Sequence, residues 1–199
     1  MKIDEWLTFF KQHQEKKLFS LQDLSQLTGE QNSSLSVQLT RLIKTGVLKR
    51  AARLWYENPF QPPAPEETAM VLRYPCYLSL EYALSKQGIL SQHVYTLTLI
   101  TTKLPYTYTT HHTIYEYHQI QQSLFWGYQS EGTVLIAEPE KAFLDLLYIR
   151  CVRTKGLTLK NVQSLLDDMT VTMFKTKRLH QYANQYGTRM KKILDLLAL

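Results

Sequence analysis

Several residue types that define other classes of protein are scarce in this sequence of 199 residues. It contains two cysteines, Cys76 and Cys151, and neither has a second cysteine at the spacing of a Cys-x-x-Cys pair. A disulfide framework and a cysteine zinc site are therefore not expected, and both thiols are predicted to be buried packing groups. Seven glycines and seven prolines are too few for collagen or a low-complexity chain.

Long apolar runs are also missing. No segment approaches the roughly 18 uncharged residues that a membrane helix needs, and residues 1–5 lack the basic and then apolar pattern of a signal peptide. We therefore expect a cytoplasmic protein without a membrane partner. The apolar fraction of 44% is typical of a soluble globular chain and excludes intrinsic disorder.

Signatures of known catalytic sites are absent as well. The sequence contains no GxSxG, P-loop, GxGxxG or HExxH motif. Glu138, Glu140 and Asp145 are acids that a DNA-processing enzyme could use, but a position at the start of a helix explains the first two through the helix dipole. Asp145 is expected to be a surface or polar-contact residue. The sequence thus predicts no catalytic residue and no enzyme.

The histidines offer one weak candidate for a metal site. On a strand, His111 and His112 would point to opposite faces, whereas His112, Glu116 and His118 would share one face. Histidines on a polar strand face are much more often solvated than bound to a metal, and no other ligand stands at a suitable spacing. We expect neither a metal nor a cofactor.

Acidic residues are missing from one stretch of the chain. The net charge is +6, and residues 39–56 carry no acid, whereas residues 1–38 carry four basic and five acidic side chains. A basic excess that is concentrated in a short segment is compatible with a polyanionic partner. The basic residues of this segment are Arg41, Lys44, Lys49, Arg50 and Arg53.

A proline-rich segment divides the chain. Four prolines fall within residues 58–65, where they resist both helix and sheet. We interpret residues 59–65 as a linker between a small domain, 1–58, and a larger one, 66–199, each of a size that can form its own core.

The pattern of the first domain predicts three helices. Ile3, Trp6, Leu7 and Phe10 recur at helical spacing and predict a helix over residues 3–14. A second, short helix follows Ser20, which can cap it together with Asp23, and it ends at Gly29. A third helix, capped by Asn32 or Ser33, runs to about Thr45 with an apolar stripe of Leu35, Leu39, Leu42 and Ile43.

A short basic hairpin is expected to follow the third helix. Residues 47–50 and 53–56 have strand character, and the intervening Ala51 and Ala52 would form the turn, although alanines are poor turn residues. The order helix, short helix, turn, helix and hairpin is typical of a winged helix-turn-helix. The expected partner of such a module is double-stranded DNA.

The outward face of the third helix carries side chains that suit a major groove. Arg41 suits a guanine edge or a phosphate, Gln38 an adenine edge and Val37 a thymine methyl group. Serines at the helix start suit phosphates, and the hairpin cations suit flanking phosphates or the minor groove. The expected DNA-binding residues are Ser33, Ser34, Val37, Gln38, Arg41, Lys44, Lys49, Arg50 and Arg53. Docking to a protein and a merely solvated helix face remain alternatives.

The second domain is predicted to mix strands and helices. Residues 76–88 are expected to form a helix with Ser79 at its N-cap, and residues 95–102 and 106–117 an antiparallel pair of strands. Residues 125–128 and 133–136 have the character of further strands. Helical patterns follow over residues 137–148, 159–168, 173–186 and 188–199. The whole chain is therefore expected to be α+β.

Four tyrosines on the second predicted strand, Tyr106, Tyr108, Tyr115 and Tyr117, allow two interpretations. They could stack on the bases of a single-stranded nucleic acid. Packing across an antiparallel sheet is the commoner role of such residues, and we favour it.

Four segments of the second domain resemble the AbiEi family of antitoxins. The most specific one is IAEPEKAFLDLLY over residues 136–148, and YLSLEYAL (77–84), VYTLT (94–98) with Thr101 and Thr102, and FWGY (125–128) support it. The family's usual motifs read like PSYISLESAL and ATPEKALLDLLY, so Cys76, Tyr82 and Glu138 are mild departures. The similarity extends over most of the chain.

This resemblance implies a role in a type IV toxin-antitoxin system. Such antitoxins counter a nucleotidyltransferase-like toxin and repress the shared operon at inverted repeats in its promoter. These toxin-antitoxin systems are similar to systems that abort phage infection. Residues 1–58 would bind DNA and residues 66–199 would provide antitoxicity. Basic residues of the last helices could add phosphate contacts, namely Lys175, Lys177, Arg178, Arg189, Lys191 and Lys192. A stand-alone regulator whose second domain senses a ligand or a partner is the alternative.

Overall fold

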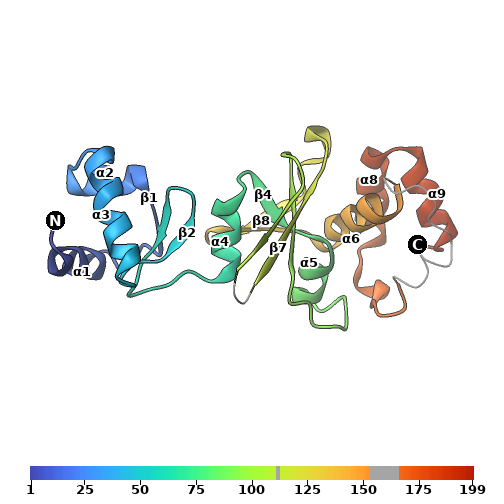
Figure 1. The fold of residues 1–199 in the computed structure, drawn as a ribbon. Coiled ribbons are helices and arrows are strands. Elements are labelled where there is room, and N and C mark those ends of the chain that lie inside the picture. Colours follow the sequence, from blue (N-terminus) through green and yellow to red (C-terminus); the bar gives the residue numbers. More distant parts are fainter. Residues whose placement is uncertain (111–112, 153–165) are drawn as a thin grey trace. The chain divides into compact units, whose positions relative to one another are not determined.

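The computed structural model describes residues 1–110, 113–152 and 166–199 (Figure 1). The chain folds as two compact α+β units, Met1–Leu72 and Arg73–Leu199. The division falls after Leu72 rather than at residue 66, because the predicted linker ends in a helix, α4 (Pro65–Leu72), that belongs to the first unit. Proline starts this helix because a first-turn residue needs no backbone N–H donor.

The first unit combines four helices with a small antiparallel sheet. Its elements in chain order are α1 (Ile3–Gln12), β1 (Leu18–Ser20), α2 (Leu21–Thr28), α3 (Asn32–Lys44), β2 (Arg50–Ala52), β3 (Trp55–Glu57) and α4. The strand order is β1-β3-β2, so β3 lies in the middle. Strand β1 was not predicted, because three residues are too few to show a period of two.

Aromatic and leucine side chains from three helices and the sheet form the core of the first unit. The predicted stripe of α3 is confirmed, because Leu35, Leu39 and Leu42 are buried, with Ile43 partly buried beside them. They meet a cluster of rings from α1 and β1, in which Trp6 stacks on Phe10 with their centroids 5.6 Å apart. Burial of this stripe leaves the opposite face of α3 in solvent.

The helix caps match the sequence pattern at α2 but not at α3. The amide of Asp23 donates to Ser20 Oγ over 3.0 Å, the amide of Ser20 donates to the Asp23 carboxylate, and Gly29 ends the helix with a left-handed φ of 71°. Asn32 and Ser33 are not caps of α3. The helix already begins at Asn32, with Gln31 at the N-cap and no side-chain cap.

The β2–β3 hairpin turns two residues later than the sequence predicts. Ala51 and Ala52 belong to β2, and the turn lies at Arg53 and Leu54, where Leu54 adopts a φ of 64°. Ala52 pairs with Trp55, and the register shifts between Arg50 and Ala52. The extended alanines therefore place Arg53 at the tip of the hairpin.

A buried asparagine closes the first unit. The amide nitrogen of Asn58 donates to the carbonyl oxygens of Phe10, His13 and Lys16, and its oxygen accepts a hydrogen bond from the amide of Phe60. Asn58 is fully buried. It therefore links three carbonyl groups at and after the end of α1 to the segment that follows β3.

The second unit is built on a mixed sheet of six strands. Its strands are β4 (Cys76–Leu78), β5 (Leu97–Thr101), β6 (Tyr106–Thr109), β7 (Ile114–Gln119), β8 (Tyr128–Glu131) and β9 (Val134–Ala137). The order is β6-β7-β5-β4-β9-β8, in which β5 with β7 and β4 with β9 are parallel pairs. The described helical elements are α5 (Leu80–Lys86), η1 (Gln122–Leu124), α6 (Pro139–Leu147), η2 (Tyr148–Val152), η3 (Val171–Met173), α8 (Thr176–Ala183), η4 (Asn184–Tyr186) and α9 (Thr188–Leu196).

Two predictions for the second unit are wrong in detail. Cys76–Leu78 is a strand rather than the start of a helix, although Ser79 does occupy the N-cap position of α5. The predicted antiparallel pair is also wrong, because residues 106–117 fold back on themselves as β6 and β7, and β5 runs parallel to β7. A bond from the amide of Thr110 to the carbonyl of Thr113 closes that hairpin.

Other predicted elements hold with shorter bounds. The buried helix is α6, β9 matches the strand over 133–136, and β8 begins only at Tyr128, so residues 125–127 are not a strand. Most of the helix predicted over 159–168 lies outside the described residues. Among the helices that are described, none is long and apolar enough to cross a membrane. Cys76 and Cys151 are buried free thiols, as predicted.

Ser20→Ala is expected to lower the free energy of unfolding of the first unit by about 1 kcal/mol, because it removes the cap of α2. Ser33→Ala is the matched control, since Ser33 is an exposed residue inside α3 rather than a cap, and we expect a change of less than about 0.5 kcal/mol. Urea unfolding followed by circular dichroism measures both values. An equal loss in the two variants would contradict the capping assignment.

Candidate functional site

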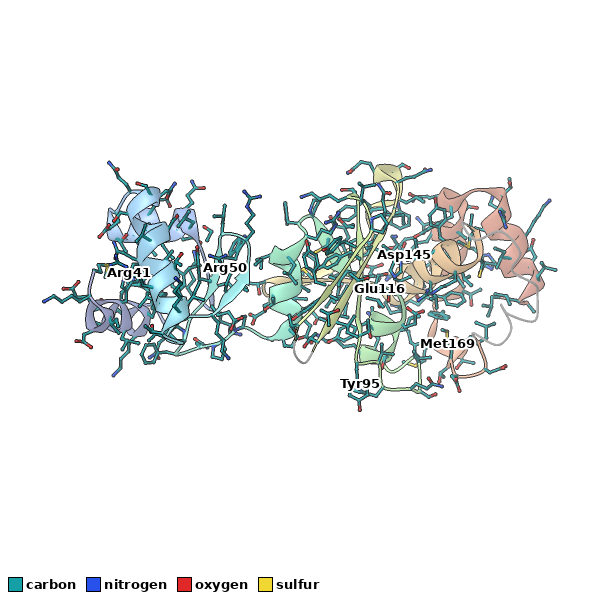
Figure 2. The ribbon with its side chains drawn as sticks, viewed as in Figure 1. Arg41, Arg50, Tyr95, Glu116, Asp145 and Met169 are labelled. Atoms are coloured by element: carbon teal, nitrogen blue, oxygen red, sulfur yellow. The ribbon has the colours of Figure 1, made fainter. Side chains whose placement is uncertain are left out.

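The exposed face of α3 is the first candidate site. Val37, Arg41 and Lys44 lie together there, as predicted, beside a shallow hollow of about 400 Å³ that Ser36 and Thr40 also line. Val37 is 53% exposed although it is apolar, and Figure 2 shows Arg41 on this helix. Ser36 and Thr40 were not among the expected DNA-binding residues, although Thr40 lies three residues after Val37 and four before Lys44, which places it on this side.

The hydroxyl groups of this face are only partly engaged. Ser36 Oγ donates to the carbonyl of Asn32 over 2.8 Å, and Thr40 Oγ1 donates to the carbonyl of Ser36 over 2.7 Å. Each hydroxyl oxygen keeps lone pairs that can accept a further hydrogen bond. The face therefore offers cations, hydroxyls and one exposed apolar side chain to a partner.

Two predicted DNA-binding residues are already hydrogen-bonded to other side chains of the first unit. Gln38 Oε1 accepts a hydrogen bond from Trp6 Nε1 over 3.0 Å, and Gln38 Nε2 donates to Glu30 Oε2 over 2.9 Å. Ser34 Oγ donates to the same Glu30 oxygen over 2.7 Å. A base edge would have to compete with these bonds, so Gln38 and Ser34 are weaker candidates for DNA contact than Arg41 and Lys44.

Glu30, which was not expected near this face, adds a negative charge to it. Hydrogen bonds from Ser34 and Gln38 hold the pKa of the Glu30 carboxyl below its usual value, so it is ionised at neutral pH. An anion near the start of α3 opposes a phosphate there. The C-terminal half of the face, around Arg41 and Lys44, is therefore the better place for a polyanion.

The hairpin adds three exposed cations. Lys49 precedes β2, and Arg53 lies at the turn. Arg50 lies on β2 (Figure 2), above the ring of Tyr56 at 5.8 Å. Within the described part of the chain, no carboxylate forms an ion pair with these three residues or with Arg41 and Lys44. Their charges are therefore available to a partner.

The six cations predicted at the C-terminus divide into two groups. Arg178 forms an ion pair with Glu138 at 3.2 Å, and Arg189 donates to the carbonyl of Cys151. Both guanidinium groups therefore already contact other parts of the second unit. The other four are exposed, namely Lys175, Lys177, Lys191 and Lys192.

The histidine candidates are described only at His118, and two of the four tyrosine candidates pack inside the sheet. His118 contacts Glu116 at 3.2 Å, His111 and His112 lie outside the described residues, and the described part of the chain holds no group of three potential metal ligands. The tyrosines pair across β6 and β7, and Tyr115 and Tyr117 are buried, which confirms cross-strand packing for these two.

A buried polar cluster on α6 is the second candidate site. Lys141 has no exposed surface, and its ammonium donates to Tyr77 Oη over 2.8 Å, to Tyr186 Oη over 2.6 Å and to Asp145 Oδ1. The other carboxylate oxygen of Asp145 accepts hydrogen bonds from Tyr77 Oη at 2.9 Å and Ser79 Oγ at 2.8 Å. Asp145 is fully buried. Of its two expected roles, the surface position is therefore wrong and the polar contact is confirmed.

Burial dominates the electrostatics of this cluster. It lowers the pKa of the Lys141 ammonium, which the neighbouring Asp145 opposes. It raises the pKa of Tyr77 and of Tyr186 well above the usual value, and the charge of Asp145 adds to this shift. Both phenols therefore stay protonated and act as hydrogen-bond donors to the carboxylate.

Aromatic rings and a close backbone contact enclose the ammonium of Lys141. The rings of Tyr77, Trp126 and Tyr186 lie 5.1–5.3 Å from it. Gly127 packs so closely that a Cβ atom there would lie 3.0 Å from Lys141 Cγ. Through its hydrogen bonds to Tyr77 and Tyr186, the buried ammonium joins α6 to the sheet and to the C-terminal part of the unit.

Two glutamates at the start of α6, Glu138 and Glu140, bind the region of the C-terminal helices. Glu138 accepts hydrogen bonds from Tyr182 Oη at 2.6 Å and from Gln129, and Glu140 accepts one from the amide of Lys175 at 2.8 Å. Burial and the bond to Glu138 raise the pKa of Tyr182 to about 12. Both glutamates therefore join the start of α6 to the region around α8.

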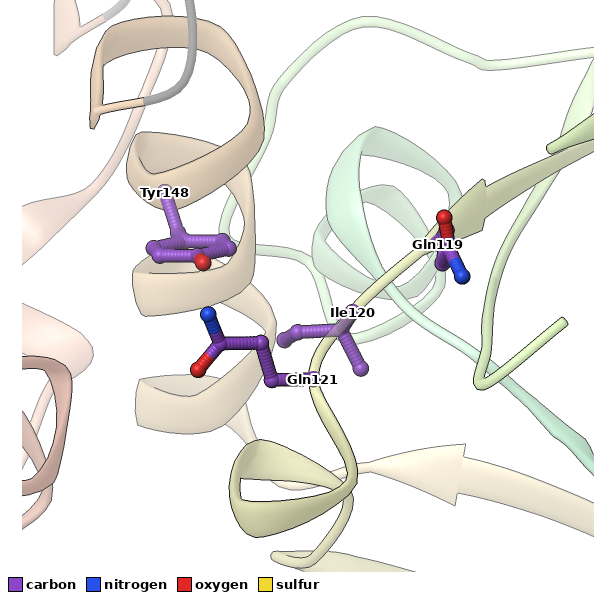
Figure 3. A pocket seen from close by; sticks show the side chains of 4 residues that line it. All are labelled: Gln119, Ile120, Gln121 and Tyr148. Atoms are coloured by element: carbon purple, nitrogen blue, oxygen red, sulfur yellow. The ribbon is translucent and has the colours of Figure 1, made fainter. Parts of the chain in front are cut away.

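A smaller hollow of about 210 Å³ lies where β7 ends (Figure 3). Gln119, Ile120, Gln121 and Tyr148 line it, and the side chain of Gln121 reaches toward the Tyr148 ring. These groups offer amides and a phenol but no charge. They do not suit a phosphate, and the hollow is less informative about function than the α3 face.

Lys141→Met is expected to lower the free energy of unfolding of the second unit by about 3–5 kcal/mol, because Asp145 would remain buried without a cation. Adding Asp145→Leu is expected to recover part of this loss, since no charge then stays buried. Urea unfolding of the single variant, the double variant and an exposed-lysine control, Lys191→Met, tests this. A double variant less stable than the single one would contradict it.

No protein-family model matches this sequence, and no curated protein matches it either. Function must therefore be inferred from the chain's own residues, above all from the exposed basic face of α3 and the neighbouring hairpin.

Proposed function

We propose that Met1–Leu72 is a winged helix-turn-helix that binds double-stranded DNA. The observation that carries this proposal is the set of five exposed cations without carboxylate partners on α3 and the β2–β3 hairpin, described above. The order of helices and strands and the small sheet support it. In this arrangement α3 enters the major groove and the hairpin is the wing.

Different side chains of α3 contact different groups of the DNA. Arg41 and Lys44 bind phosphates or a guanine edge, and Val37 contacts a thymine methyl group. Ser36 and Thr40 supply hydroxyl groups on the same face. Lys49, Arg50 and Arg53 bind flanking phosphates, which adds affinity with little sequence information.

We further propose that Arg73–Leu199 provides antitoxicity and that the chain represses its own operon at inverted repeats. This proposal rests on the resemblance of four segments to AbiEi antitoxins. The described contacts support a non-catalytic role for the most specific segment, since Glu138, Glu140, Lys141 and Asp145 all bind other parts of the unit. The functional partner of the chain in this proposal is a nucleotidyltransferase-like toxin.

Arg41→Ala and Lys49→Ala are each expected to weaken binding of the purified chain to the DNA upstream of its own coding sequence. Each change should also reduce the slope of log K against log salt by roughly one, because one phosphate contact is lost. Lys11→Ala is the control, because it removes an exposed charge from α1 outside the proposed interface. Fluorescence anisotropy over a salt series measures both quantities.

Binding that does not distinguish the upstream duplex from a scrambled one, with unchanged slopes in both variants, would contradict the DNA-binding proposal. It would favour a winged helix that docks to a protein.

The antitoxin proposal has a separate test in the full chain. Arg41→Ala combined with Lys49→Ala, expressed from an independent promoter, is expected to lose repression of a reporter behind the upstream DNA. It should still rescue growth when the product of the neighbouring reading frame is expressed. Loss of both activities in a folded variant, or no toxic neighbour to rescue from, would contradict the proposed division of labour and favour a stand-alone regulator.

A further inference from the structure

The tyrosines of β6 and β7 divide into a buried pair and a pair that reaches the surface. Tyr115 and Tyr117 are 3% and 1% exposed, whereas Tyr106 is 53% exposed and Tyr108 is half-buried. The ring centroids of Tyr106 and Tyr108 lie 4.5 Å apart. Packing across the strands accounts for the buried pair. It does not account for the open ring of Tyr106.

A cation from another segment lies over this open ring. The guanidinium of Arg73 is 5.5 Å from the centroid of the Tyr106 ring, and its Nε donates to the carbonyl of Leu104 over 2.8 Å. These two contacts hold the guanidinium against the surface, although Arg73 precedes Leu104 by 31 residues. Aromatic rings and guanidinium planes are both groups on which proteins stack unpaired bases.

The neighbours of these residues in the sequence are exposed as well. Tyr74, which follows Arg73, is 69% exposed, and Leu104 is 71% exposed. Lys103, which precedes Leu104, is also exposed. We call this group the Tyr106 surface, and it comprises Arg73, Tyr74, Lys103, Leu104, Tyr106 and Tyr108. It combines aromatic rings, an apolar side chain and two cations.

The two cations of this surface lie around the same buried groups. Burial raises the pKa of the Tyr117 phenol, and the charge of Arg73 opposes this rise. Burial also raises the pKa of the Cys76 thiol, and the charge of Lys103 opposes it. The thiol of Cys76 in turn affects the pKa of Tyr117, so the two buried groups are neighbours. Arg73 and Lys103 therefore approach the same part of the sheet.

No negative charge offsets these cations. In the part of the chain that the structure describes, neither Arg73 nor Lys103 forms an ion pair with a carboxylate. Glu116 is the only acid of β6 and β7, and it is the partner of Thr107, so it lies on the face of the hairpin opposite to the tyrosines. A ligand that suits this surface therefore has anionic groups beside flat ones.

We propose that the Tyr106 surface binds single-stranded nucleic acid. Unpaired bases stack on the rings of Tyr74 and Tyr106 and on the guanidinium of Arg73. Lys103 binds a phosphate of the same strand. A duplex keeps its bases within its own stack, so this ligand differs from the double-stranded DNA proposed for Met1–Leu72.

Charge favours this ligand over a protein. A protein at this surface would have to supply carboxylates for two cations, whereas every nucleotide of a single strand brings a phosphate together with a flat base. The proposal does not rest on DNA binding by the first unit, because it uses only residues of Arg73–Leu199.

Tyr106→Ala tests the stacking contact in the full chain. It is expected to weaken binding of fluorescent oligo(U) and oligo(dT), each about ten nucleotides long, by about 5- to 100-fold. Both oligonucleotides are used because stacking and phosphate contacts do not require the 2′-hydroxyl group. Tyr95→Ala is the matched control, since it removes a tyrosine that is 82% exposed before β5 (Figure 2). Fluorescence anisotropy measures the affinities, and circular dichroism confirms that both variants are folded.

Lys103→Ala tests the phosphate contact by a different quantity. It is expected to reduce the slope of log K against log salt by about 0.7, because one contact to a single strand is lost. Arg41→Ala is the control from the first unit, and it should leave the binding of both oligonucleotides unchanged. Conversely, Tyr106→Ala should leave binding of the upstream duplex unchanged.

Two results overturn the proposal. A wild type that binds neither oligonucleotide excludes single-stranded nucleic acid as the ligand and favours a protein at the Tyr106 surface. Single-strand binding that Arg41→Ala abolishes and Tyr106→Ala leaves unchanged assigns that binding to the first unit instead.

Photo-cross-linking gives a second measurement that needs no variant. Oligo(U) that contains 5-bromouridine is irradiated with the wild-type chain, and mass spectrometry identifies the linked peptides. Links are expected at Tyr74, Tyr106 or Tyr108 and not at Tyr95. Links that fall only within Met1–Leu72 overturn the proposal.

Discussion

A lysine that has no contact with water holds the second unit together. Lys141 and Asp145 occupy successive turns of α6, and their shared hydrogen bonds reach Tyr77 on β4, Ser79 at the start of α5 and Tyr186 near the C-terminus. A buried ion pair is a costly way to join elements, because both charges lose their hydration. It is tolerated here because hydroxyl groups satisfy the carboxylate and three aromatic rings surround the ammonium.

This arrangement gives a physical meaning to the segment that most resembles the antitoxins. Its charged residues are directed into the fold, where Glu138 and Glu140 bind the region of α8 and Lys141 and Asp145 bind the sheet. The motif therefore describes contacts that assemble the second unit. For the first unit, we propose that the exposed face of α3 meets the partner.

Local signals were predicted well and distant contacts were not. The cap at Ser20, the stripe of α3 and the length of α6 each depend on residues within one or two turns, and the sequence shows them. The strands β1 and β4 have three residues each and are stabilised by partners far along the chain, so no sequence pattern predicts them. Gln38 looked available on its helix, but Trp6, 32 residues away, binds its amide. The burial of Lys141 was not predicted for the same reason, because its partners Tyr77 and Tyr186 are 64 and 45 residues distant.

We propose above all that the chain binds DNA through α3 and the β2–β3 hairpin. Hydrogen exchange of the full chain, with and without the duplex from upstream of its coding sequence, tests this most directly because it reports on every segment at once. The duplex is expected to slow exchange in Asn32–Lys44 and in the hairpin, and to leave Arg73–Leu199 unchanged or affected only at its exposed C-terminal lysines. Protection confined to the six-stranded sheet, with α3 unaffected at saturating duplex, would contradict it.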